Sequence, residues 1–264
     1  MSVLPQFAAY AFDLDGTIYL GDDALPGAVE TIAELRGAGA RVVFVTNKPL
    51  DSATDYADKL TALGIPATRD DVITAIDALV AYLTARHPAS RLLAVAEPLL
   101  CAELAAAGFT MTDDPAQTDV VVVSFDRTFT YAKLLAAFRA VRDHGAAIVA
   151  TNPDAYCPTP DGGLPDCAAM LAAVEACTGA CAEAIVGKPS PYMARALLDR
   201  LGVEAAELAV VGDRLTTDVA MGQSVGATGI LVLTGATPAD LAAGADYVIE
   251  TLDQLKPTYR GALT

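Results

Sequence analysis

The sequence predicts an α/β protein built on a doubly wound parallel β-sheet. The first observation is that short runs of continuous apolar residues, such as RVVFV at 41–45 and VVVV at 120–123, alternate with helix-like segments along most of the chain. Strands that are apolar without alternation are typical of a parallel sheet covered on both faces. The second observation is the repeated order of strand, helix and strand, which favours right-handed crossovers in a doubly wound sheet.

The first series of elements runs to residue 86. We expect strands at 8–13, 41–46 and 72–74, and helices at 27–38, 51–63 and 75–86. Pro26 lies near the start of the first of these helices and Gly39 lies just beyond its end. Proline and glycine are favoured at those two positions, which supports the assignment of this helix.

Two further series follow the same pattern. The second has expected strands at 91–96, 120–125 and 146–151, and helices at 99–108, 131–145 and 167–177. The third has expected strands at 182–187, 208–212, 229–234 and 247–250, and helices at 191–202 and 217–226.

The composition indicates a folded chain with a substantial core. A length of 264 residues suggests one large domain or two modest ones, and the content of 53% hydrophobic against 19% charged residues argues against disorder. No uninterrupted apolar run reaches the ~18 residues that a membrane span needs, and residues 1–6 lack the features of a signal peptide. We therefore expect a soluble, cytoplasmic protein.

The charge balance restricts the partners. The net charge is −16, from 17 basic and 33 acidic residues, which argues against binding to nucleic acid or to anionic membranes. An anionic substrate would need a local source of positive potential.

Cysteine and histidine offer little for catalysis. Cys177 and Cys181 have the i, i+4 spacing of a helix, but no histidine or second cysteine pair completes a usual zinc site. His87 and His144 both fit helix ends. A Ser-His-Asp triad is not expected, and acid–base chemistry must come from carboxylates.

Polar residues follow several of the expected strands. Asp13 and Asp15 lie two residues apart in DLDG, so that in an extended chain their side chains point the same way. Ligands of doubly wound sheets bind beyond the carboxyl ends of the strands, and we expect four strands to deliver their terminal groups to one edge. These groups are Asp13 with Asp15, Thr46 with Asn47, Lys188, and Asp213.

Each of these residues, and Asp218 shortly after them, has a simple structural explanation by itself, in a turn or a helix end. Together they fit phosphoryl transfer. A carboxylate can attack phosphorus and form an aspartyl-phosphate. Clustered carboxylates need a divalent cation, and oxygen ligands favour Mg²⁺. A hydroxyl, backbone N–H groups and a lysine would hold the phosphoryl oxygens.

The motifs DLDGT, TNK, GKPSPY and GDRLTTD, in this order, resemble the four signature motifs of the haloacid dehalogenase-like (HAD) hydrolase superfamily. ATNPDAYCPTPDGG, CAAMLAAVE and GKPSPYM resemble its large-cap class IIA subfamily, which holds NagD-like and AraL-like sugar phosphatases, 4-nitrophenyl phosphatases and phosphoglycolate phosphatases. The resemblance implies a Rossmann-like catalytic core at 1–89 and 182–264, with an inserted α/β cap at 90–181. It also implies a Mg²⁺-dependent hydrolase of small phosphate monoesters.

Carried over by position, the resemblance implies Asp13 as the nucleophile and Asp15 as the general acid and base. Thr46 and Asn47 would bind the phosphoryl group, and Lys188 would bind it and balance its charge. The implied metal ligands are Asp13, Asp15 through its backbone carbonyl, and Asp213, with Asp218 supporting the metal's waters or Lys188.

The cap is expected to select the substrate. Its Pro/Gly-rich segment 154–166 matches the subfamily's specificity loop, in which Tyr156, Cys157 and Pro158 are the candidates for contacts with the leaving group. A plain surface loop is the alternative interpretation. For the whole protein, the alternatives are a phosphomutase-like enzyme and a non-catalytic binding module. The composition and the subfamily both favour a homodimer.

Overall fold

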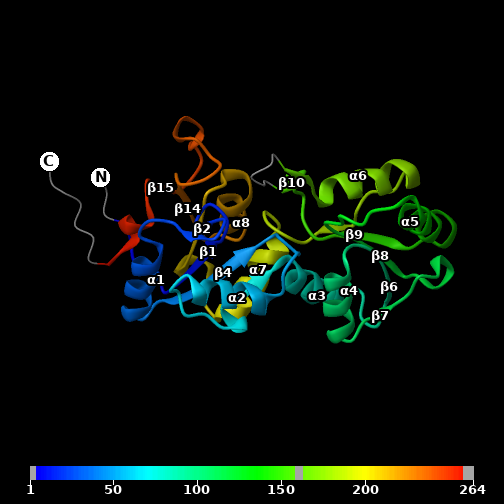
Figure 1. The fold of residues 1–264 in the computed structure, drawn as a ribbon, viewed down its shortest axis with the longest axis horizontal. Helices are drawn as coiled ribbons and strands as arrows, with labels where there is room; N and C mark the ends of the chain where they lie inside the picture. The colour runs from blue at the N-terminus through cyan, green and yellow to red at the C-terminus, as the bar shows by residue number, and fades with distance from the viewer. Residues whose placement is uncertain (1–3, 158–162, 258–264) are drawn as a thin grey trace. The chain divides into compact units, whose positions relative to one another are not determined.

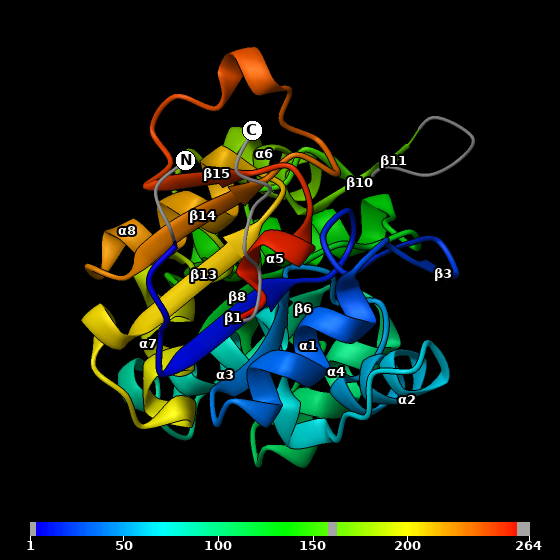
Figure 2. The same cartoon turned by 90° about the vertical axis from the view of Figure 1, so that its left-hand side faces the viewer.

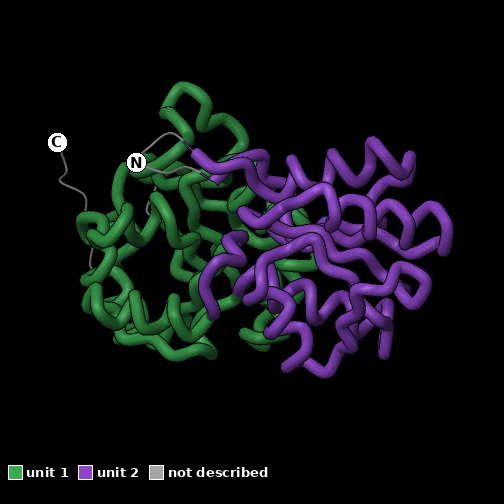
Figure 3. The backbone as a smooth tube through the Cα atoms, turned by 45° about the vertical axis from the view of Figure 1, so that its right-hand side comes forward, with its two compact units in different colours: residues 1–46, 53–73, 188–264 green, residues 47–52, 74–187 purple. Residues whose placement is uncertain are grey.

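The computed structural model describes residues 4–157 and 163–257, and the predicted α/β fold is confirmed. The chain forms two compact units, shown in different colours in Figure 3. The first consists of Met1–Thr46, Ala53–Ile73 and Lys188–Thr264, and the second of Asn47–Ser52 and Thr74–Gly187.

The first unit is built on a six-stranded sheet in the order β15-β14-β13-β1-β4-β5, part of which faces the viewer in Figure 2. Its central strand β1 pairs in parallel with β13 and with β4. The strands are β1 (Ala9–Asp13), β4 (Arg41–Thr46), β5 (Val72–Thr74), β13 (Leu208–Gly212), β14 (Thr228–Val232) and β15 (Tyr247–Ile249). A small antiparallel pair follows β1, formed by β2 (Tyr19–Leu20) and β3 (Asp23–Ala24).

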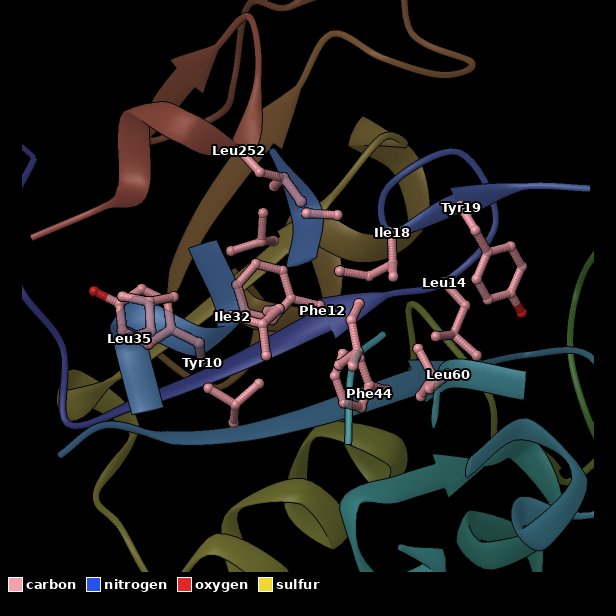
Figure 4. Packing of buried hydrophobic residues seen from close by; sticks show 14 of the residues in the cluster. Tyr10, Phe12, Leu14, Ile18, Tyr19, Ile32, Leu35, Phe44, Leu60 and Leu252 are labelled. Atoms are coloured by element: carbon pink, nitrogen blue, oxygen red, sulfur yellow. The ribbon is translucent and has the colours of Figure 1, made fainter. Parts of the chain in front are cut away.

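Helices cover both faces of this sheet. Alternate residues of its buried strands point to opposite sides, so both faces present apolar side chains that helices cover. Phe12 of β1 and Phe44 of β4 belong to one large apolar cluster together with residues of α1 (Ala28–Gly37) and α2 (Ala53–Ala62), as Figure 4 shows. A smaller cluster on Leu231 of β14 contains Val219, which precedes α8 (Ala220–Ser224). The remaining helix of this unit, labelled in Figure 1, is α7 (Pro191–Leu201).

The second unit has a five-stranded sheet of its own, in the order β12-β9-β8-β6-β7, and its neighbouring strands pair in parallel. Its strands are β6 (Arg91–Val95), β7 (Thr110–Met111), β8 (Val120–Val123), β9 (Ala147–Ala150) and β12 (Ala184–Ile185). Its helices are α3 (Ala75–Arg86), α4 (Pro98–Ala106), α5 (Tyr131–His144) and α6 (Cys167–Thr178). Two further short strands, β10 (Tyr156–Cys157) and β11 (Leu164–Pro165), pair antiparallel as a hairpin.

The second unit extends beyond the range 90–181 at both ends. The strand β12 belongs to it because Ala184 and Ile185 pair with β9. The helix α3 belongs to it as well, and the hydroxyl of Tyr82 donates a hydrogen bond of 2.5 Å to Glu183. This corrects one expectation: the strand before Lys188 is not a strand of the six-stranded sheet, so three strands of that sheet, not four, end in candidate residues.

Several single-turn helices complete the chain. A π-helical turn at Leu215–Val219 replaces the start of the helix expected at 217–226. The 3₁₀ turns are Arg69–Asp71, Pro115–Gln117, Ala205–Glu207, Ala239–Leu241 and Leu252–Leu255. Within the described ranges, no helix has the length and apolar character that crossing a bilayer would require.

Candidate active site

The turn that follows β1 is fixed by backbone geometry. Gly16 has φ of +88°, a conformation that side chains disfavour. Its N–H donates a hydrogen bond of 2.8 Å to the carbonyl of Tyr19, and its carbonyl accepts one of 2.7 Å from the hydroxyl of Thr234. Asp13 is the last residue of β1, and 12% of its side chain is exposed. Asp15 lies in the turn and forms an isolated β-bridge with Tyr19.

Lys188 lies between two carboxylates. Its buried Nζ donates to Oδ1 of Asp13 and, at 2.7 Å, to Oδ1 of Asp218. The residues after Lys188 start α7, where Ser190 is the N-cap and accepts a hydrogen bond of 3.2 Å from the N–H of Tyr192. The helix expected at 191–202 thus begins at the predicted residue, three residues after Lys188.

Asp213 directly follows β13, and its two carboxylate oxygens have different surroundings. Oδ2 accepts a hydrogen bond of 2.6 Å from the N–H of Ala236, whereas Oδ1 is buried and has no hydrogen-bond partner. Glycines allow the chain to approach this side chain: a Cβ at Gly16 would lie 2.7 Å, and one at Gly235 2.1 Å, from Oδ2. The role of Ala236 was not predicted, because a backbone donor 23 residues further along leaves no signal in the side-chain pattern.

The charges of Lys188 and of the three carboxylates Asp13, Asp213 and Asp218 do not balance. Burial raises the pKa of Asp13 from 3.8 to about 8; Lys188 lowers it, and the charges of Asp218 and Asp213 raise it again. Burial also raises the pKa of Asp213, with a further contribution from Asp218. Burial disfavours the charged form of Lys188, but Asp13 and Asp218 together raise its pKa above the usual value. Three carboxylates around one ammonium group leave excess negative charge, which a cation would neutralise.

A divalent cation fits these residues. One carboxylate oxygen from each of Asp13, Asp213 and Asp218 lies within 4.8 Å of the others. The donors are all oxygen, which suits Mg²⁺ or Ca²⁺. The unpartnered Oδ1 of Asp213 is a buried acceptor of the kind that a metal ion satisfies. Asp218 is also the ion-pair partner of Lys188, one of its two expected roles, and ligation through the backbone carbonyl of Asp15 stays a prediction.

The two expected phosphoryl-binding residues lie at the end of β4. Thr46 is its last residue and is buried, and Asn47 follows in the second unit. The amide of Asn47 donates a hydrogen bond of 2.9 Å to Oδ2 of Asp154. Asp154 could not be singled out from the sequence, since it lies in a loop with several other polar residues.

Two family models match the chain: "Haloacid dehalogenase-like hydrolase" over residues 10–110 and "HAD-hydrolase-like" over residues 185–255. Sugar-phosphatase AraL of Bacillus subtilis is 36% identical over 228 residues, which are 86% of this chain and 84% of that protein. The chain belongs to the haloacid dehalogenase-like hydrolases. Within them it belongs to the NagD-like subfamily, and NagD from Escherichia coli is among its structural neighbours.

Two other solved structures resemble this HAD hydrolase. A p-nitrophenyl phosphatase from Archaeoglobus fulgidus has a TM-score of 0.89 at 30% identity, covering 95% of this chain and 98% of that one. A glycerol phosphate phosphatase from Mycobacterium tuberculosis, in complex with calcium, has a TM-score of 0.87 at 32% identity, covering 95% of this chain and 75% of that one. This chain is a HAD phosphatase that acts on phosphate monoesters of small molecules.

In the second unit of this HAD phosphatase, Tyr156 and Cys157 form β10, and Pro158 lies outside the described residues. Tyr156 is 59% exposed, as a residue that contacts a ligand from a loop would be. Cys157, by contrast, is 7% exposed and pairs with Leu164 of β11. The alternative of a plain surface loop therefore does not hold at Cys157, because the hairpin buries it, and contact of these residues with the leaving group stays a prediction.

The surroundings of Asp213 predict an effect on stability. In this HAD phosphatase without added metal, we expect Asp213→Asn to raise the free energy of unfolding by about 1–3 kcal/mol, because the amide removes a buried negative charge that Asp218 repels. The unfolded pKa of Asp213 is near 3.8 and the folded one is higher. The wild type therefore gains stability from the protonated carboxyl, fully below pH 3.8, and loses this stability as the pH rises through the folded pKa. The difference in free energy of unfolding between Asp213→Asn and the wild type should thus grow with pH.

Urea unfolding in a chelator between pH 5 and 8 measures this difference. The exposed Asp199→Asn serves as the matched control and should unfold like the wild type. Destabilisation by Asp213→Asn at pH 8 would contradict the assignment.

Proposed function

We propose that the protein is a Mg²⁺-dependent phosphatase that hydrolyses small phosphate monoesters through an aspartyl-phosphate on Asp13. Sugar phosphates, 4-nitrophenyl phosphate and phosphoglycolate-like esters are the substrates we expect. The observation that carries the proposal is the place of Asp13: a carboxylate at the end of a central strand, touching a buried lysine and grouped with two further carboxylates.

The side chains divide the reaction between them. Asp13 attacks phosphorus and the bond from phosphorus to the ester oxygen breaks. Asp15 protonates the departing oxygen and later takes a proton from the water that hydrolyses the aspartyl-phosphate. Lys188 lowers the pKa of Asp13 and, with Thr46 and Asn47, holds the phosphoryl oxygens, where transition-state charge is spread.

Asp13, Asp213 and the carbonyl of Asp15 would hold the Mg²⁺, with Asp218 supporting its waters or Lys188. When bound, this ion supplies positive charge that stabilises the transferring phosphoryl group and relieves repulsion between the carboxylates. The raised pKa of Asp13 in the absence of metal supports this role, because a cation would favour the ionised nucleophile.

The test of this proposal is a panel of phosphorylated metabolites with Mg²⁺, ranked by kcat/KM. EDTA should abolish hydrolysis, Mg²⁺ should restore it, and Ca²⁺ should inhibit. The reason is that Ca²⁺ accepts a looser coordination shell and can draw Asp13 into bidentate ligation, which disables it as a nucleophile. Full activity in a chelator would refute the metal site.

The second unit is proposed to select the substrate through Tyr156, an exposed residue of its hairpin. We expect Tyr156→Ala to change the order of preferred substrates while leaving the unfolding transition unchanged, because Tyr156 is exposed. Cys157 is unsuitable for this test because it is buried. The exposed Tyr131→Ala, elsewhere in the same unit, is the control. A uniform loss across all esters, or no change, would remove Tyr156 as a selector.

The partners proposed from the sequence are a small phosphate ester and a second copy of the chain. The homodimer and the cytoplasmic location remain predictions, which analytical ultracentrifugation and cell fractionation would test.

A further inference from the structure

A polar network lies at the carboxyl end of β9, in the second unit. The amide of Asn152, a fully buried residue, donates a hydrogen bond of 3.3 Å to the backbone carbonyl of Asn47. The backbone N–H of Asp154 donates one of 3.0 Å to Oδ1 of Asn152, and Oδ2 of Asp154 accepts one of 2.9 Å from Nδ2 of Asn47. The main chain and the side chain of Asn47 are thus both held by residues that follow β9.

This network sets the orientation of the Asn47 amide. An ionised aspartate only accepts hydrogen bonds, so the NH₂ group of Asn47 must face Asp154, and its oxygen must point elsewhere. That oxygen lies against Gly187, where a Cβ would stand 2.6 Å from it. Gly187 is itself fixed, since its N–H donates a hydrogen bond of 2.7 Å to the carbonyl of Thr151. With one N–H directed at Asp154, the plane of the amide fixes the direction of the other.

Charged residues near this network also interact with the segment that follows β4, which contains Asn47 and Lys48. Asp166 is buried next to the same network, and burial raises its pKa to about 6. A hydrogen bond from Asn152 and the charge of Lys48 lower this pKa, and the charge of Asp154 raises it. Asn47 thus donates a hydrogen bond to Asp154, and Lys48 is close enough to Asp166 to lower its pKa.

We propose that Asp154 is a positioning residue for phosphoryl transfer: it holds the Asn47 amide in the orientation in which Asn47 binds the transferring phosphoryl group. This inference rests on the proposed function, in which Asn47 binds that group. Asn47 directly follows Thr46, the last residue of β4, and its side chain is held by Asp154.

A double-mutant cycle tests the inference. With Mg²⁺ and 4-nitrophenyl phosphate, Asn47→Ala should lower kcat/KM about 10²-fold, the order expected when one donor to the transition state is lost. Asp154→Asn should lower it about 10-fold, mostly through kcat, because a misdirected donor still binds in part. In the Asn47→Ala background, Asp154→Asn should have no further effect, because Asp154 acts through Asn47.

Three controls separate positioning from stability. Asp154→Glu keeps the carboxylate and should recover part of the lost rate. Asp114→Asn removes a carboxylate of the same unit that accepts from Ala116 and Gln117, and should leave the kinetics unchanged. The affinity for inorganic phosphate, measured by calorimetry with Mg²⁺, should weaken in both single variants and no further in the double variant.

The outcomes distinguish this inference from the proposed function. An active wild type in which the two losses multiply, or in which Asp154→Asn has no effect, overturns the role of Asp154 alone. A folded wild type that neither hydrolyses esters nor binds phosphate overturns the proposed function and the inference with it.

Discussion

Asp13→Asn is expected to remove hydrolysis of every phosphate ester, whatever its leaving group, with a loss of about 10⁴-fold or more, the order found when other enzymes lose a covalent nucleophile. An amide is a poor nucleophile and cannot form the aspartyl-phosphate. The loss must be general because every ester transfers its phosphoryl group to Asp13, whatever its leaving group. The burial of Asp13 next to Lys188 leaves little room for water to replace it.

Acid quenching followed by mass spectrometry measures the covalent intermediate. The wild type should gain the mass of one phosphoryl group on the peptide that contains Asp13, and Asp13→Asn should not. Asp23→Asn, an exposed carboxylate in β3 of the same unit, is the matched control and should be phosphorylated normally. A phosphorylated Asp13→Asn protein would show that another residue is the nucleophile.

Asp15→Asn is expected to act unevenly on different esters. An alkyl phosphate expels a strongly basic alkoxide and needs a proton, whereas a nitrophenyl ester expels a weakly basic phenolate and hardly needs one. General acid catalysis contributes about 10²–10⁴-fold, so the first step should slow by that order for alkyl esters and far less for 4-nitrophenyl phosphate. Hydrolysis of the aspartyl-phosphate would still lack its base.

Rapid-quench kinetics on Asp15→Asn with both esters tests this division of roles. The variant should release nitrophenolate in a burst close to one equivalent and then turn over slowly. Asp22→Asn, exposed in the turn between β2 and β3, is the control and should show no burst beyond that of the wild type. Equal losses on both esters without a burst would make Asp15 a structural or metal-positioning residue.

Most of the motif residues were identifiable from the sequence because they follow strands that a local run of apolar residues predicts. The apolar runs before Asp13, Thr46 and Asp213 predict buried parallel strands, and β1, β4 and β13 are neighbours in one sheet. Because parallel strands present their carboxyl ends at one edge, the residues that follow them converge. The Ser190-Pro191 helix start was likewise local, since a side-chain cap and a fixed φ act within one turn.

Pairing between distant segments decided the rest. The apolar run before Lys188 joins the second sheet, next to β9, and the sequence pattern of a strand carries no information about which sheet it enters. Cys157 is buried because a hairpin pairs it with Leu164, and Asn47 is oriented by Asp154, which is 107 residues away along the chain.

By itself, then, the sequence determined the alternation of strands and helices and the residue types at the strand ends, because both depend on local periodicity and chemistry. Only the tertiary structure decided how the chain divides into two sheets. It also decided that Lys188 lies between Asp13 and Asp218, and that one oxygen of Asp213 is buried without a partner. Those features arise from contacts between segments far apart in sequence, whose geometry is fixed by packing and not by any local pattern.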